Sequence, residues 1–162
     1  MRWGRSPDAL LAGLAGDWVI DRVVEGLATL HGSARFAPTR AGALAYAESG
    51  TLTLAGGGRL RAERRYVFRA ASGGFDVLFD ETPERLFHSI LPVPQGDALV
   101  GRAAHLCGAD TYESTYRFEP DGGMRIVHRV RGPAKDYVSR TAYRREGDQS
   151  RGVCGRGGSE SR

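Results

Sequence analysis

The segment that most constrains the fold is the stretch from Leu60 to Phe68, LRAERRYVF, in which side chains alternate between two faces. Alternation with a period of two is typical of a strand with one buried face. The apolar face nevertheless includes Arg64, between Ala62 and Tyr66. A buried polar group left without a hydrogen-bond partner costs about 1–3 kcal/mol. We therefore expect this face to line a polar cavity.

Polar side chains recur at inward positions of other alternating segments. Tyr46 and Glu48 occupy alternate positions of one segment, and Tyr112 and Tyr116 occupy alternate positions of another. His128 lies between two inward apolar residues of a third. Because each polar group in an apolar core needs a partner, the pattern favours a small barrel that encloses a polar cavity.

Glu48 and Arg64 have matching inward parity on segments that we expect to be adjacent antiparallel strands. Facing residues of opposite charge interact across a sheet. The pair either orients a carboxylate or carbonyl group of a ligand, or is a buried ion pair that only specifies register. The sequence leaves both interpretations open.

The periodicity of the chain changes once, near Gly16. Before it, Ser6 can cap a helix that begins at Pro7, with Asp8 at its positive end, and the apolar pattern continues to about Leu14. After it, alternating segments are separated by turns rich in glycine and proline. The expected strands span residues 17–24, 32–38, 43–50 with a continuation at 52–54, 60–70, 75–80, 85–91, 98–107, 112–119, 124–130 and 137–145.

Short strands at this spacing predict an antiparallel sandwich or barrel. We expect one mainly β domain over residues 1–146, with about 8–10 antiparallel strands and a short N-terminal helix. Residues 147–162 show no apolar periodicity, so a disordered tail is expected there.

Composition excludes several classes of protein. No segment approaches the ~18 apolar residues that a membrane span requires. The 23 basic residues are arginines except Lys135, and they are spread over many strands, so nucleic acid is not an expected partner. Cys107 and Cys154 are poorly placed for a disulfide, which indicates reduced thiols and a cytoplasmic protein. We expect a monomer or a homodimer.

The start and end of the strand series resemble the calycin pattern of lipocalins and fatty-acid-binding proteins. Gly16-Asp17-Trp18 opens the first strand directly after the helix, and the last strand ends in Tyr143-Arg144-Arg145. The resemblance favours a single closed antiparallel barrel of about 8–10 strands over a sandwich. It also implies that Trp18 plugs one end of the barrel and that Arg144 or Arg145 packs across it.

Five motifs occur in order between residues 11 and 145. They are Gly16-Asp17-Trp18, Tyr46-Ala47-Glu48-Ser49-Gly50, Arg85-Leu86-Phe87-His88, His105-Leu106-Cys107-Gly108-Ala109-Asp110-Thr111-Tyr112 and Gly132-Pro133-Ala134-Lys135-Asp136-Tyr137. Together they resemble a bacterial and fungal family of small lipocalin-like domains of unknown function. The resemblance implies a fold and no activity.

Histidine and cysteine are the side chains here best suited to catalysis or metal binding. His105 and Cys107 share one face of a strand, where they could ligate zinc, form a nucleophile and base pair, or be plain walls of the pocket. Zinc would need His88 or His128 as further ligands. A haem with an axial histidine is a further alternative. We expect no metal and no cofactor, because the usual ligand spacings are missing.

These patterns predict a barrel that binds a small molecule in a polar cavity lined by Tyr, His and Arg. The alternative is a cofactor-independent cyclase, isomerase or dehydratase of specialised metabolism. In it, the expected catalytic residues are His105, His128 and Tyr112. The expected ligand-binding residues are Tyr46, Glu48, Arg64, Tyr66, His88, Tyr116, Lys135 and Tyr137.

Overall fold

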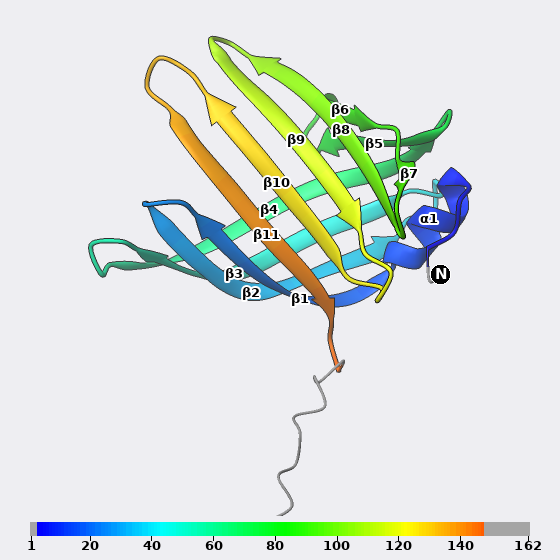
Figure 1. The fold of residues 1–162 in the computed structure, drawn as a ribbon, viewed down its shortest axis with the longest axis horizontal. Coiled ribbons are helices and arrows are strands. Elements are labelled where there is room, and N and C mark those ends of the chain that lie inside the picture. Colours follow the sequence, from blue (N-terminus) through cyan, green and yellow to red (C-terminus); the bar gives the residue numbers. More distant parts are fainter. Residues whose placement is uncertain (1–2, 148–162) are drawn as a thin grey trace, which may run out of the picture.

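The computed structural model describes residues 3–147, which form one helix and eleven strands (Figure 1). The helix is α1 (Pro7–Leu14). The strands are β1 (Gly16–Val24), β2 (Ala28–Pro38), β3 (Leu44–Leu54), β4 (Arg59–Ala71), β5 (Gly74–Phe79), β6 (Arg85–Ile90), β7 (Val93–Gln95), β8 (Ala98–Cys107), β9 (Asp110–Phe118), β10 (Met124–Arg131) and β11 (Asp136–Arg145).

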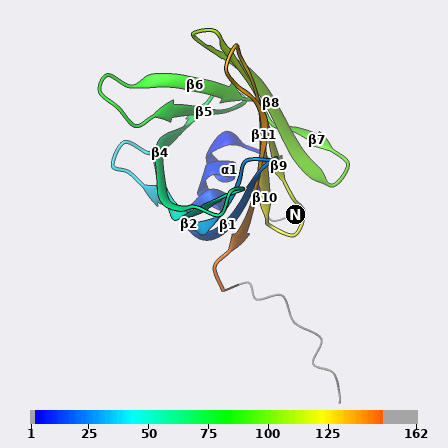
Figure 2. The same cartoon turned by 90° about the vertical axis from the view of Figure 1, so that its left-hand side faces the viewer.

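All eleven strands belong to one antiparallel sheet. Its order is β6-β5-β4-β3-β2-β1-β11-β10-β9-β8-β7, so each strand pairs with its neighbour in the chain except where β1 meets β11. The sheet curls until β5 and β6 return toward β8 (Figure 2). The prediction of a mainly β, antiparallel barrel with a short N-terminal helix is confirmed, with eleven strands rather than about 8–10.

The barrel closes by side-chain packing at the seam between β6 and β8. Among residues 3–147, no backbone pairing joins these two strands. Gly101 of β8 lies so close to β6 that an added Cβ would fall 2.3 Å from Ile90 Cγ2. Because Gly101 has no side chain, β8 can approach β6 at this seam.

Helix α1 closes one end of the barrel. Ser6 Oγ accepts a hydrogen bond from the Ala9 amide, as expected of an N-cap, and the apolar face of the helix is buried through Leu10, Leu11 and Leu14. The hairpin turns β1–β2, β3–β4, β8–β9 and β10–β11 lie at the opposite end (Figure 1). Only that end is left open.

Trp18 lies at the centre of the closed end and is fully buried. Its ring stacks on Trp3 at a centroid distance of 6.3 Å, and its indole nitrogen donates a 2.9 Å hydrogen bond to the Leu14 carbonyl. The Arg145 guanidinium lies 3.9 Å above the Trp18 ring and donates to the carbonyls of Gly13 and Ala15. The plug expected from the resemblance is thus present, with Arg145 rather than Arg144 as the partner.

Two strands continue through glycines that the sequence reading treated as boundaries. Gly32 of β2 faces Gly50 of β3, and a Cβ on Gly32 would fall 2.1 Å from the Ser49 carbonyl oxygen. The glycines allow the two backbones to approach closely, so β2 begins at Ala28 and β3 runs unbroken to Leu54. The short strand β7 lies where only a turn was expected.

Residue 147 is the last described residue, so the predicted disordered tail lies almost wholly outside the described part of the chain. Within residues 3–147, no helix combines the length and apolar character needed to cross a membrane.

Candidate functional site

A cavity of about 670 Å³ occupies the open end of the barrel. Its walls are mostly apolar and include Leu30, Leu52, Phe79, Phe87 and Val130. Its polar lining residues are Arg22, Arg64, Tyr66, Arg85, Cys107, Tyr112, His128, Tyr137 and Ser139. A volume of this size is within the usual range for small-molecule sites.

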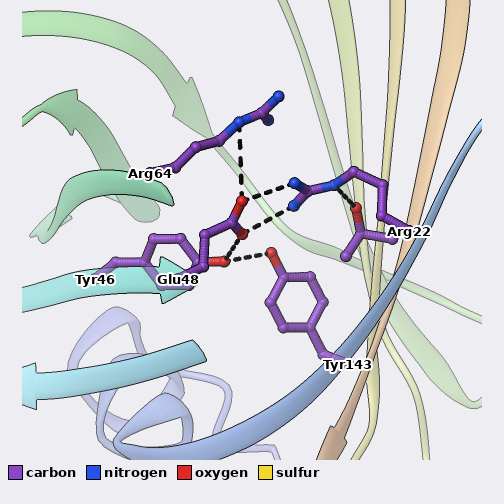
Figure 3. A network of polar contacts seen from close by, with 6 residues as sticks. Arg22, Tyr46, Glu48, Arg64 and Tyr143 are labelled. Carbon is purple, nitrogen blue, oxygen red and sulfur yellow. Dashed lines mark hydrogen bonds and ion pairs between the residues drawn. The ribbon is translucent and has the colours of Figure 1, made fainter. Parts of the chain in front are cut away.

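A buried carboxylate lies behind Arg22, one of the polar residues that line the cavity. Glu48 of β3 receives two hydrogen bonds from Arg22 of β1, at 2.7 Å and 2.9 Å (Figure 3). Arg22 also donates from Nε to Thr141 Oγ1 at 2.7 Å. Both charged side chains are almost inaccessible to solvent. The planar guanidinium and the carboxylate therefore form a bidentate pair in a low-dielectric environment.

The ionisation of this pair follows from its contacts. Burial opposes ionisation of Glu48, but the hydrogen bonds and charge of Arg22 outweigh it and hold the Glu48 pKa below its usual value. Burial likewise opposes the charge of Arg22, and Glu48 more than compensates, so the Arg22 pKa is raised. The pair is ionised at neutral pH.

Two tyrosines extend the hydrogen-bond network of the Glu48 carboxylate. The Tyr46 hydroxyl donates a short hydrogen bond to Glu48, and the hydroxyls of Tyr46 and Tyr143 lie 2.8 Å apart. Burial raises the pKa of Tyr143 to about 12 and that of Tyr46 well above its usual value. Both phenols are therefore neutral donors that help to fix the carboxylate.

Arg64 lies directly opposite Glu48 in the β3–β4 ladder, as the matching parity predicted. Its Nε is 3.8 Å from Glu48 Oε1, and its side chain is 48% exposed. Arg22, not Arg64, is thus the principal partner of Glu48. Figure 3 shows the terminal nitrogens of Arg64 turned away from the carboxylate.

The sequence reading missed Arg22, although a signal for it was present. Trp18 was expected to point into the barrel, and strict alternation along the same strand places Ile20 and Arg22 on that face. The parity argument that located Arg64 on its strand would therefore also have located Arg22.

His128 of β10 lines the cavity beside this network. Its Nδ1 lies 2.7 Å from the Ser114 hydroxyl, which fixes the ring orientation. Burial, with smaller contributions from the charges of Arg64 and Arg22, lowers its pKa to about 4. The imidazole is therefore neutral at pH 7. Ser114 is itself buried and does not line the cavity, so it positions His128 and is not available as a nucleophile.

His88 of β6 was expected in the binding site but does not line the cavity. A register shift between Val77 and Leu78 places both Phe87 and His88 inside the barrel, and the Phe87 ring lies against His88 at 4.1 Å between centroids. His88 Nε2 is 2.7 Å from the Tyr116 hydroxyl, and Nδ1 has no hydrogen-bond partner among the described residues. Burial, then the neighbouring histidines, lowers its pKa to about 3.

His105 faces inward on β8 but also fails to reach the cavity surface. Its ring packs on Phe87 at 5.3 Å, and its buried Nε2 lacks a hydrogen-bond partner within residues 3–147. Cys107 does line the cavity mouth as an exposed free thiol. The alternative in which Cys107 and His105 form a nucleophile and base pair at the cavity therefore finds no support, because only Cys107 lines it.

The remaining predicted residues divide between the rim and the interior. Tyr112 and Tyr137 line the cavity near its mouth. Lys135 lies outside it, with Nζ 3.1 Å from Asp110 and 3.4 Å from the Tyr112 hydroxyl. Tyr116 belongs to a smaller cavity of about 20 Å³ that lies among the buried groups, together with Tyr46 and Glu48.

The alternative of a metal site finds no geometric support in the part of the chain that the structure describes. In residues 3–147, no three histidine, cysteine, aspartate or glutamate side chains are grouped so that they could hold a metal ion. The Phe87 ring packs against all three inward histidines, and the rings of His88 and His128 also lie beside each other, 6.3 Å between centroids.

The chain belongs to DUF6314, a family of unknown function, whose sequence profile matches residues 14–145. No curated protein matches the chain. Among solved structures, a redesigned β-barrel, mFAP1, bound to DFHBI, is similar at 12% sequence identity and a TM-score of 0.39. The alignment covers 88% of this chain and 100% of that one.

Proposed function

We propose that this DUF6314 domain binds a small molecule in the cavity at the open end of its barrel. The observation that carries the proposal is the cavity itself, about 670 Å³ in volume, with apolar walls and a polar floor. Sites for small molecules combine a largely apolar lining with a few fixed polar groups. Two of these polar groups, Arg22 and His128, lie on strands and are fixed by hydrogen bonds, so this part of the site is preorganised.

The apolar walls select the body of the ligand. Phe79 and Phe87 present aromatic rings, whose centroids are 5.0 Å apart, and Tyr66 lies within 6.0 Å of both. Leu30, Leu52 and Leu54 complete the opposing wall. A ring-containing, mainly apolar molecule would bury its surface against these groups, with one polar end toward Arg64 and His128.

The neutral fluorescent amine N-phenyl-1-naphthylamine is a suitable probe, because its emission rises in an apolar site. Ala62 lines the cavity, so Ala62→Trp should fill it and weaken probe binding at least tenfold. Ala104→Trp is the matched control, since Ala104 is exposed on the outer face of β8. Equal binding by wild type and Ala62→Trp would refute a site in the cavity.

His128 favours a second candidate, acid–base catalysis in the same cavity. A neutral imidazole that is oriented by Ser114 and borders the cavity can accept or donate a proton. Tyr112 also lines the site, whereas His105 does not. Native mass spectrometry of wild type and His128→Gln isolated from the host separates the two candidates. Binding alone predicts the same retained compound in both proteins, and catalysis predicts that only the variant retains unconverted substrate.

A further inference from the structure

Charges around the cavity are unbalanced. Three arginines line it, Arg22, Arg64 and Arg85, and no aspartate or glutamate is among the described residues that do so. A cavity with low-dielectric walls strengthens the field of any charge on its lining. The question is which of these three charges remains available to a ligand.

Arg22 is already neutralised. Its two terminal nitrogens bind both oxygens of Glu48, and its Nε binds Thr141. Arg85 is balanced in a different way, at the rim. Its Nε is 2.7 Å from Glu81, and its guanidinium lies 4.4 Å above the Phe79 ring.

Arg64 has no comparable neutralising partner among the described residues. Its nearest carboxylate is Glu48 at 3.8 Å, and that carboxylate is already held by Arg22 and by the Tyr46 hydroxyl. Tyr66, which also interacts with Arg64, is a neutral group whose pKa is raised by burial. The cluster of Arg22, Glu48 and Arg64 therefore carries one net positive charge, located on Arg64 beside the cavity.

We infer that the ligand is an anion, an apolar ring compound with a single carboxylate or similar group that binds the terminal nitrogens of Arg64. This inference rests on the proposed binding function and specifies the class of ligand. The half-exposed Arg64 side chain borders both Tyr66 and His128 in the cavity lining. An anion at this position would neutralise the positive charge of Arg64, and the ring system of the ligand would lie toward Phe79 and Phe87.

The test measures displacement of N-phenyl-1-naphthylamine by two competitors of the same shape, 2-naphthoate and its neutral analogue 2-naphthamide. On the wild-type protein, we expect 2-naphthoate to compete at least tenfold better, because hydrogen bonds to a charged group contribute about 1.5–3 kcal/mol, which corresponds to roughly 10–150-fold. Equal competition, or displacement by neither compound, would overturn the inference without any variant.

Arg64→Met should abolish the preference for 2-naphthoate over 2-naphthamide, a ratio that is measured within each protein and so is independent of its affinity for the probe. Arg61→Met is the matched control, because Arg61 lies on the outer face of the same strand and its side chain is 73% exposed. A preference that persists in Arg64→Met would also refute the role of Arg64. Failure of the binding function itself is distinguishable, since the probe would then bind Ala62→Trp as well as wild type.

Discussion

Arg22→Met is the substitution that most directly tests the polar floor of the barrel. Arg22 and Glu48 are both buried and are joined by two hydrogen bonds, so loss of the guanidinium leaves a buried carboxylate. Removing one partner of such a pair costs about 3–5 kcal/mol. Arg64 at 3.8 Å and the Tyr46 hydroxyl remain near Glu48, so we expect the lower end of that range, about 3 kcal/mol.

Urea unfolding followed by the fluorescence of the two buried tryptophans, Trp3 and Trp18, measures this loss. With a urea dependence of about 2 kcal/mol per M, a loss of about 3 kcal/mol lowers the midpoint by about 1.5 M. Arg64→Met should lower it far less, by under about 0.5 M, because a half-exposed pair contributes at most about 1 kcal/mol.

A double substitution identifies the cause of the destabilisation. Glu48→Gln removes the unpaired charge but keeps a side chain that can accept the hydrogen bond from Tyr46. Adding it to Arg22→Met should restore more than half of the lost stability. The reasoning is refuted if Arg22→Met and Arg64→Met shift the midpoint equally, or if the double variant is as unstable as the sum of the two single variants.

Two further predictions concern the closed end and the histidines. Trp18→Ala should cost about 3–5 kcal/mol in urea unfolding, because it empties the fully buried plug, and a change under about 1 kcal/mol would show that the plug is dispensable. The pKa values of His88 and His128 are lowered to about 3 and about 4, against about 6.5 in an unfolded chain. Between the folded and the unfolded pKa of each histidine, the unfolded state therefore binds more protons than the folded state. Stability should therefore fall as the pH drops below about 6.5, and His128→Gln should reduce that slope by up to about 1.4 kcal/mol per pH unit. An unchanged slope would contradict a neutral, half-buried His128.

Alternation along the chain predicted the series of antiparallel strands, and the resemblance to calycins favoured the barrel over the sandwich. The alternation located the strands, placed Trp18 at the start of the first one, and set Glu48 opposite Arg64 in the correct register. These features depend on period-two geometry and on pairing between strands that are consecutive in the chain, and both are encoded locally. The boundaries at Gly32 and Gly50 were wrong because a glycine in sequence does not distinguish a turn from a close approach of two strands.

The depth of each inward side chain was decided only by the tertiary structure. His88, His105 and His128 all have inward positions and pack around Phe87, yet only His128 borders the cavity. The order of side chains across a barrel depends on bulges and on the course of the seam, which period-two geometry does not specify.

The principal partner of Glu48 was also beyond the reach of the sequence pattern. Alternation assigns both Arg22 and Glu48 to the inner face, but they lie on β1 and β3, which are separated by β2. They meet because the sheet curls and because Gly32, inward on the intervening strand, has no side chain and lies against the β3 backbone. Pairing between neighbouring strands follows from local register, whereas contact across an intervening strand depends on the curvature of the whole sheet.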